Sequence, residues 1–250
     1  MRSDASNHEA AAAAAILGGS IVLALSCGRL GQQRGPTAAA RYPHAAPLSE
    51  YRETSAAAEI ALARSAAPPS ISAHAAVLVL GDSGYTTAVP GTNGFVCFVE
   101  RSWAADVNEP EFWNPKVRGP NCFNAIAART ELPQYLARTH WVLAGAGRQE
   151  IIARTRAAFA NHTFRNPEPG ALSYMLSRGG YLNDDAAGPW LPHLMFFVPH
   201  GDTAGWGAGS AGSPIIRADG SDIESTVLLV PVLQWSDGSP AQPPAMEPPK

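Results

Sequence analysis

An apolar run at Ala10–Leu25, just before a cysteine at position 27, restricts the fold more than any other feature of this sequence. A membrane-spanning helix needs about 20 apolar residues, and this run is shorter and contains Gly18 and Gly19. Its length is typical of the apolar core of an export signal, and Arg2 supplies the basic residue that precedes such a core. We therefore expect residues 1–27 to lie outside the folded domain.

The residues around Cys27 predict how this signal is processed. The run ends Leu23-Ala24-Leu25-Ser26-Cys27, which resembles a bacterial lipobox, where the cysteine after a small residue becomes diacylated. The order of Ala24 and Leu25 is the reverse of the commonest one. We expect a lipid anchor on Cys27, contact with a membrane and a location in the cell envelope, outside the cytoplasm. The alternatives are an ordinary secretory signal that is cut elsewhere and an uncleaved anchor.

Two segments of biased composition limit the folded part of the chain. Residues 28–47 are rich in Gly, Gln, Pro, Ala and Arg without periodicity, which is typical of a flexible tether. Residues 239–250 contain five prolines and are expected to be a disordered tail. This leaves 48–238 as a single domain. The formal net charge of −3 gives no basis for binding nucleic acid, which needs a concentrated positive surface.

The residue pattern of this domain predicts an α+β fold with a mainly antiparallel sheet and two or three packed helices. Strands, then helices, then strands, without strict alternation, are typical of that class. Residues 103–123 read as a loop, and Pro231 indicates an edge strand or a strand end. The expected helices are Ser49–Ala66, Pro133–Leu143 and Gln149–Asn161, and the expected strands are Ala75–Leu80, Tyr85–Val89, Phe95–Arg101, Leu194–Val198 and Thr226–Leu233.

The cysteines predict a disulfide. The chain has three, an odd number, and lipidation of Cys27 would leave Cys97 and Cys122 as the only possible pair. A compartment outside the cytoplasm allows such a bond to form and persist. We expect the bond to tie the loop that ends at Cys122 to the strand that holds Cys97.

Two serines stand in short motifs that resemble catalytic ones. The strand that ends Gly81-Asp82-Ser83 resembles the nucleophile block of the SGNH hydrolases, but it lacks the helix after the serine and the Asp-x-x-His pair near the C-terminus. Ser210 stands in an Ala-Gly-Ser-Ala-Gly variant of the nucleophile elbow, inside a glycine-rich loop. We expect a hairpin turn at Ser83 and a non-catalytic binding or structural domain, with a serine hydrolase as the alternative.

Aromatic residues predict the position of a pocket. Trp190, His193 and Trp206 lie near one another in the sequence, beside a glycine-rich loop at 201–213. We expect Tyr174, His193 and Trp206 to share a concave surface next to that loop. The sequence has no metal-ligand spacing, phosphate loop or dinucleotide fingerprint, so we expect neither a metal nor a cofactor.

Several segments between Ala75 and Gly238 together resemble a group of exported bacterial proteins of unknown function. The resemblance implies an exported domain and brings no activity, cofactor or catalytic residue with it. The segments are Gly91-Thr92-Asn93-Gly94-Phe95 with Cys97, then Cys122, Ser173-Tyr174-Met175-Leu176, Pro192-His193-Leu194-Met195-Phe196-Phe197, Gly212-Ser213-Pro214 and Trp235-Ser236-Asp237-Gly238.

Overall fold

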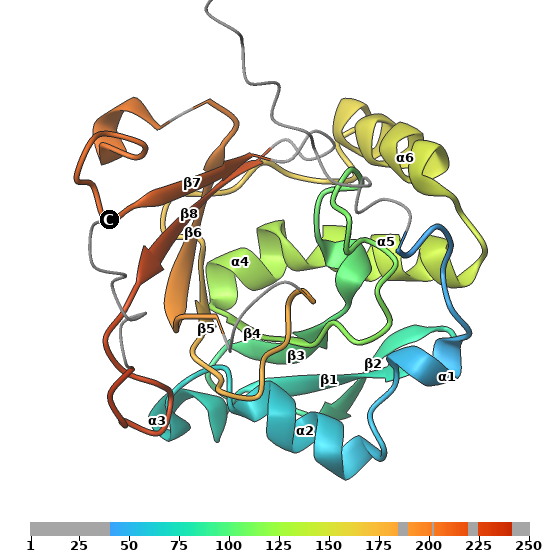
Figure 1. Ribbon diagram of the computed structural model, residues 1–250, viewed down its shortest axis with the longest axis horizontal. Helices are drawn as coiled ribbons and strands as arrows, with labels where there is room; N and C mark the ends of the chain where they lie inside the picture. Colours follow the sequence, from blue (N-terminus) through green and yellow to red (C-terminus); the bar gives the residue numbers. More distant parts are fainter. Residues whose placement is uncertain (1–40, 185–189, 202, 220–224, 242–250) are drawn as a thin grey trace, which may run out of the picture. The chain divides into compact units, whose positions relative to one another are not determined.

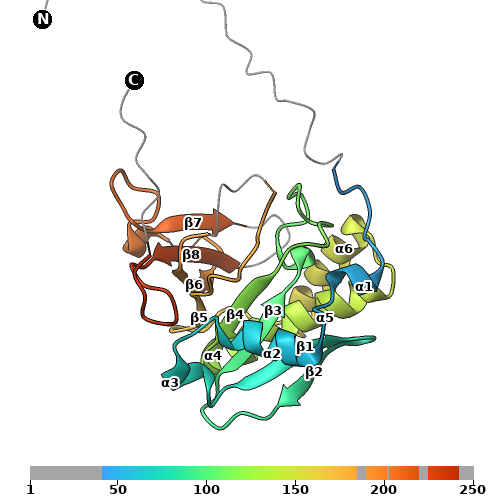
Figure 2. The ribbon, with the colours of Figure 1, turned by 60° about the horizontal axis from the view of Figure 1, so that its bottom comes forward.

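A computed structural model describes residues 41–184, 190–201, 203–219 and 225–241 (Figure 1). The export signal, Cys27 and residues 242–250 of the predicted tail lie outside these ranges. Within them, no helix combines the length and the apolar character that crossing a membrane requires. The strands form one eight-stranded sheet in the order β2-β1-β3-β4-β5-β6-β8-β7, which can be followed in Figure 2. Only β1 and β3 pair in parallel, so the predicted α+β class with a mainly antiparallel sheet is confirmed.

The elements come in groups along the chain: α1 to α3, then β1 to β4, then α4 to α6, then β5 to β8. Three helices, α2, α5 and α6, have nine or more residues. The strands are β1 (Ala76–Gly81), β2 (Gly84–Val89), β3 (Val96–Glu100), β4 (Gly119–Phe123), β5 (Leu172–Met175), β6 (His193–Pro199), β7 (Ile216–Asp219) and β8 (Ser225–Pro231). The helices are α1 (Leu48–Tyr51), α2 (Ala56–Arg64), α3 (Pro69–Ser72), α4 (Ala125–Thr130), α5 (Leu132–Leu143) and α6 (Arg148–Ala160), with 3₁₀ turns at Ser102–Ala104 and Ala204–Trp206.

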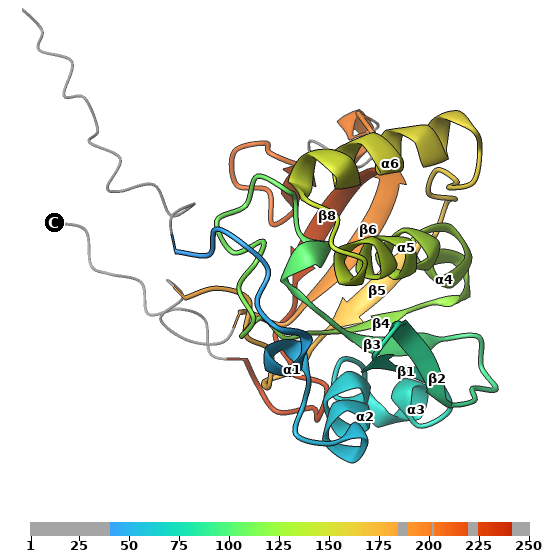
Figure 3. The same ribbon diagram turned by 90° about the vertical axis from the view of Figure 1, so that its right-hand side faces the viewer.

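Helices cover both faces of the β1–β4 part of the sheet (Figure 3). Side chains alternate across a strand, so Val77 and Cys97 pack toward α2, while Leu78 and Phe98 pack toward α4 and α5. We call these the α2 face and the α5 face. The two covered faces explain why β1 is apolar on both sides and why β3 is apolar from Val96 to Val99.

The structure divides the helix expected at Ser49–Ala66 into α1 and α2. The hydroxyl of Ser55 accepts a hydrogen bond from the backbone N–H of Ala58 at 3.1 Å, which caps a new helix start. The other two expected helices are confirmed, because α5 and α6 differ from the expected bounds by a single residue at each changed end.

The segment 103–123 contains a strand that the sequence did not indicate. All five residues of β4 are buried, including Pro120, so this strand shows none of the alternation that marks a half-exposed strand. The short elements β5, β7 and α4 were also missed. Pro231 is the last residue of β8, which lies between β6 and β7, so this proline marks a strand end and not a sheet edge.

The folded domain extends beyond the expected limits at 48 and 238. Tyr42, in the expected tether, donates a hydrogen bond from its hydroxyl to Asp184 at 2.7 Å. Near the other end, the N–H of Ala241 donates to the carbonyl of Leu233 at 2.8 Å, and Ala241 is buried. Residues 41–47 and 239–241 therefore belong to the domain.

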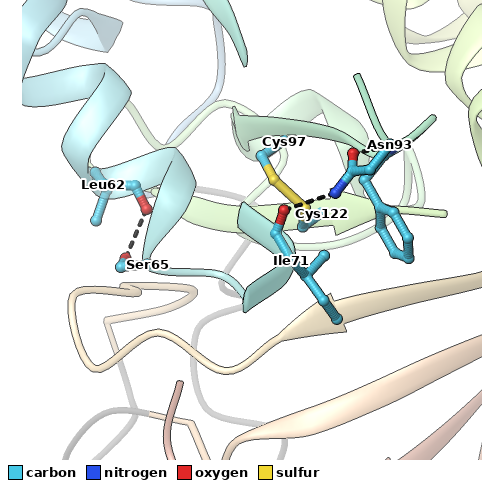
Figure 4. Close-up of a disulfide and its surroundings, with 7 residues drawn as sticks. Leu62, Ser65, Ile71, Asn93, Cys97 and Cys122 are labelled. Atoms are coloured by element: carbon cyan, nitrogen blue, oxygen red, sulfur yellow. Dashed lines mark hydrogen bonds between the residues drawn. A yellow bond between two sulfur atoms is a disulfide. The ribbon is translucent and has the colours of Figure 1, made fainter. Parts of the chain in front are cut away.

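The predicted disulfide between Cys97 and Cys122 is present (Figure 4). The two cysteines are direct partners in the β3–β4 register, and both are fully buried on the α2 face. Nearby, the Asn93 amide donates to the carbonyl of Ile71 at 2.8 Å, which ties the turn before β3 to α3. The expected reason for the bond was wrong: Cys122 lies in a strand, so the bond links two neighbouring strands and does not fasten a loop.

Candidate functional site

A cleft of about 370 Å³ opens on the α5 face of the sheet. Its floor comes from β5, β6 and β8, one end comes from the last residue of β3, and α5 contributes Tyr135. The walls come from the segment that follows β3 and from Leu182, Asn183 and Trp190. The lining residues include Glu100, Tyr135, Met175, Trp190, His193 and Met195.

The floor of the cleft is apolar because of the strand register. Met175 is the direct partner of His193 between β5 and β6, and Met195 is the partner of Leu229 between β6 and β8. Directly paired residues of antiparallel strands point to the same face, so these four side chains lie together on the α5 face. Methionine side chains adapt to the shape of what they contact, which suits a binding floor.

Glu100 is the principal acidic group of the cleft. It ends β3 directly opposite Gly119, where an added Cβ would lie 3.2 Å from the Cβ of Glu100 and 3.3 Å from Leu182. The glycine therefore leaves room for the carboxylate. The Asn121 amide donates a hydrogen bond to Oε1 of Glu100, and Oε2 has no partner among the residues placed by the structure. Burial raises the pKa of Glu100 to about 7, and the Asn121 hydrogen bond opposes the rise.

His193 presents an open acceptor to the same cleft. Its side chain is 4% exposed, and Nδ1 lies 2.8 Å from the carbonyl oxygen of Leu191. A carbonyl only accepts, so Nδ1 carries the proton and Nε2 is left as an acceptor. Within the described ranges Nε2 has no hydrogen-bond partner. Burial lowers the pKa of His193, which keeps the imidazole neutral.

Two further side chains complete the site. Burial raises the pKa of Tyr135 well above its usual value, so its hydroxyl stays protonated. The Trp190 ring is 44% exposed at the rim, and its centroid lies 5.8 Å from that of His193. The cleft therefore combines an apolar floor, an aromatic rim and a small number of polar groups, which is the usual composition of a small-molecule site.

The structure does not bring the predicted pocket residues together. Tyr174 is the neighbour of Met175 along β5, so it points to the α2 face, where its ring lies 6.2 Å from that of Phe95. Trp206 packs on Phe196, with ring centroids 5.6 Å apart, and Phe196 points away from the face that holds His193. Of the three residues expected to share a pocket, only His193 lines the cleft. The reason is that side chains alternate between the two faces of a strand.

Sequence reasoning missed Glu100, although the sequence carries a signal for it. Val96, Phe98 and Glu100 alternate along β3 and therefore share a face. A carboxylate that continues an otherwise apolar stripe is expensive to bury unless something compensates it, and this marks it as a candidate functional residue. Tyr135 carries no comparable signal, because aromatic residues on a helix face most often belong to the core.

Neither candidate nucleophile has a hydrogen bond from its hydroxyl to a histidine among the described residues. Ser83 is exposed in the turn between β1 and β2, as expected. His140 approaches it, but Nδ1 lies 3.5 Å from the backbone carbonyl oxygen of Ser83 and makes no hydrogen bond to the hydroxyl. Asp82 pairs with Arg52 at 2.5 Å and is not paired with a histidine. Ser210 is exposed in a series of turns before β7.

Within the described part of the chain, no three His, Cys, Asp or Glu side chains are grouped so that they could hold a metal ion. The chain matches no protein-family model, no curated protein and no solved structure.

Proposed function

We propose that this chain is an exported, lipid-anchored protein of the cell envelope that binds a small ligand in the cleft on the α5 face. One observation carries the binding proposal: Oε2 of Glu100 and Nε2 of His193 open onto one apolar floor, and neither has a hydrogen-bond partner among the described residues. Both atoms stay accessible from the cleft, so the N–H or O–H donors of a ligand can reach them directly, beside an apolar floor that favours its apolar part.

The disulfide supports the proposed location. Bonds such as Cys97–Cys122 persist in oxidising compartments and are rare in the reducing cytoplasm. The lipobox-like ending at Cys27 adds the anchor to this proposal, and diacylation would hold the domain at a membrane surface.

Replacing Cys27 by Ser should release the protein from membranes. Each buried CH₂ group of an acyl chain contributes about 0.8 kcal/mol to membrane binding, so loss of the acyl chains removes the anchor. The measurement is the distribution of the protein between membrane and soluble fractions, together with its intact mass. The matched control is Ser26→Ala, which keeps a small residue before the cysteine and should leave the protein in membranes. An unmodified mature protein that starts at another residue would contradict the proposal.

Filling the cleft should abolish ligand binding. We expect Met195→Trp to remove the binding of small apolar fragments, because the larger ring occupies the floor between β6 and β8. Ligand-observed NMR with a fragment set would measure this on the full chain. Leu229→Trp, on the neighbouring strand, provides a second variant, and circular dichroism reports whether each variant is folded.

The matched control for both variants is Leu233→Trp, because Leu233 is 78% exposed and does not line the cleft. It should bind every fragment that the unmodified protein binds. If no fragment binds the unmodified protein, or if both folded cleft variants bind as well as the control, the binding proposal is wrong.

A further inference from the structure

We infer that the ligand of this cleft carries a protonated amine joined to an apolar body. This inference rests on the proposed binding function and names the chemical class of the ligand. It follows from three features of the cleft: the type of its open polar groups, its charge and the nature of its floor.

The open polar groups are acceptors. Oε2 of Glu100 receives no hydrogen bond from any described residue, and Nε2 of His193 is unprotonated because its other nitrogen donates to Leu191. An ammonium group has up to three N–H donors and no acceptor, so it matches these groups. A ligand whose polar end only accepts hydrogen bonds would leave both unsatisfied.

The charge of the cleft also selects a cation. Asp219 is paired with Arg217 at 2.6 Å and Glu111 with Arg41 at 4.0 Å, but Glu100 and Glu109 have no cationic partner in the part of the chain that the structure describes. Arg101 borders the cleft, yet its guanidinium is held by Glu59 and backbone carbonyls. Among the described lining residues, an anionic ligand would meet carboxylates without cationic partners and no arginine or lysine free to pair with it.

The floor and the rim explain the apolar body. Met175, Met195 and Leu229 form a continuous apolar surface beside the acceptors. The half-exposed Trp190 offers a ring face, which attracts cations as well as apolar groups. A divalent metal ion fits poorly, because hard cations need six or more oxygen ligands and the described residues hold no group of three metal-binding side chains.

Three probes of nearly equal size test this inference: 2-phenylethylamine, 2-phenylethanol and phenylacetate. Isothermal titration on the full chain should show that the amine binds at least about tenfold more tightly than the alcohol, since a hydrogen bond to a charged group exceeds a neutral one by this order. Phenylacetate should not bind. Glu100→Gln keeps the shape of the side chain and should weaken only the amine, by about tenfold.

The control variant is Glu168→Gln, because Glu168 lies on the surface, where it pairs with Arg129, and does not line the cleft. It should leave the affinity for all three probes unchanged. This comparison separates loss of the Glu100 carboxylate from a general loss of negative charge.

The pH dependence supplies a second readout. Glu100 must be ionised to pair with the amine, and its pKa is raised to about 7 by burial. Groups that face it are Asn121 from β4, Tyr135 from α5 and Tyr85 from β2, and burial keeps both tyrosines protonated in this range. The amine itself stays protonated below about pH 9, as lysine does. Its affinity should therefore rise from about pH 6 to about pH 8, and Glu100→Gln should flatten the rise.

The possible failures are distinguishable. Equal affinity for the amine and the alcohol, or an unchanged amine affinity in folded Glu100→Gln, overturns the amine inference and leaves the binding function in place. The amine inference is also overturned, and the binding function kept, if none of the three probes binds while other fragments bind the unmodified protein and no longer bind Met195→Trp. Absence of any fragment binding in the cleft overturns the proposed function itself.

Discussion

Replacing Arg101 by Met should lower the free energy of unfolding by about 3–5 kcal/mol, the typical cost of removing one partner from a buried ion pair. Arg101 is 1% exposed, and its Nη2 lies 2.8 Å from Oε1 of Glu59, which is also buried. Its other donors bind the carbonyls of Tyr51, at 2.6 Å, and Val99. The substitution leaves a carboxylate and two carbonyls without these partners in the interior.

The effect should be large also because Arg101 joins several elements. Arg101 directly follows β3 and binds α1 at the carbonyl of Tyr51 and α2 at Glu59. Glu59 in turn accepts a hydrogen bond from the N–H of Leu80 in β1 at 3.1 Å. Urea unfolding followed by tryptophan fluorescence measures the loss. The double variant Arg101→Met with Glu59→Gln should recover part of the stability, since no unpaired carboxylate is then buried.

The matched control is Arg154→Met. Arg154 also pairs with a glutamate, Glu150, at 2.5 Å, but both side chains are about half exposed on α6. Exposed pairs of this kind contribute about 0.3–0.5 kcal/mol, so the control should change stability little. A loss below about 1 kcal/mol in Arg101→Met would show that the buried pair does not hold α1 and α2 to the sheet.

Loss of the Cys97–Cys122 bond should lower the free energy of unfolding by about 3 kcal/mol. The bond closes a loop between residues 25 positions apart, and the chain-entropy model assigns a loop of this length roughly that stabilisation. Cys97→Ala combined with Cys122→Ala removes the bond together with two buried sulfur atoms. Comparing oxidised with reduced unmodified protein isolates the bond alone, because the side chains are otherwise the same.

Thiol labelling checks that the bond forms in the cell. Protein isolated from the envelope and denatured without reductant should show no free thiol at either position, because both cysteines are fully buried and paired between β3 and β4. Two labelled thiols at these positions would refute the pairing and would weaken the proposal of export.

Local patterns determined much of this protein. Short apolar or β-branched segments between turn residues predicted β1, β2, β3, β6 and β8. Pro133 and Gly145 predicted the limits of α5, and the apolar face of residues 149–161 predicted α6. All these signals depend on neighbours in the sequence. The disulfide followed from counting cysteines. The strand β4 was not predicted, because burial on both faces removes the alternation of polar and apolar residues. The first expected helix was predicted as one element, because the hydrogen bond from Ala58 to Ser55 that starts a second helix is seen only in the structure.

The cleft was decided by tertiary structure. Glu100 and His193 come from distant parts of the chain, and they share a cleft because β3, β4, β5 and β6 are consecutive neighbours in the sheet. No local pattern specifies that order, since strand pairing depends on contacts between distant residues. The strand register then determines which side chains face the cleft: because Met175 pairs with His193 on one face, Tyr174 points to the opposite face. A shift of one residue would reverse this choice, because side chains alternate along a strand.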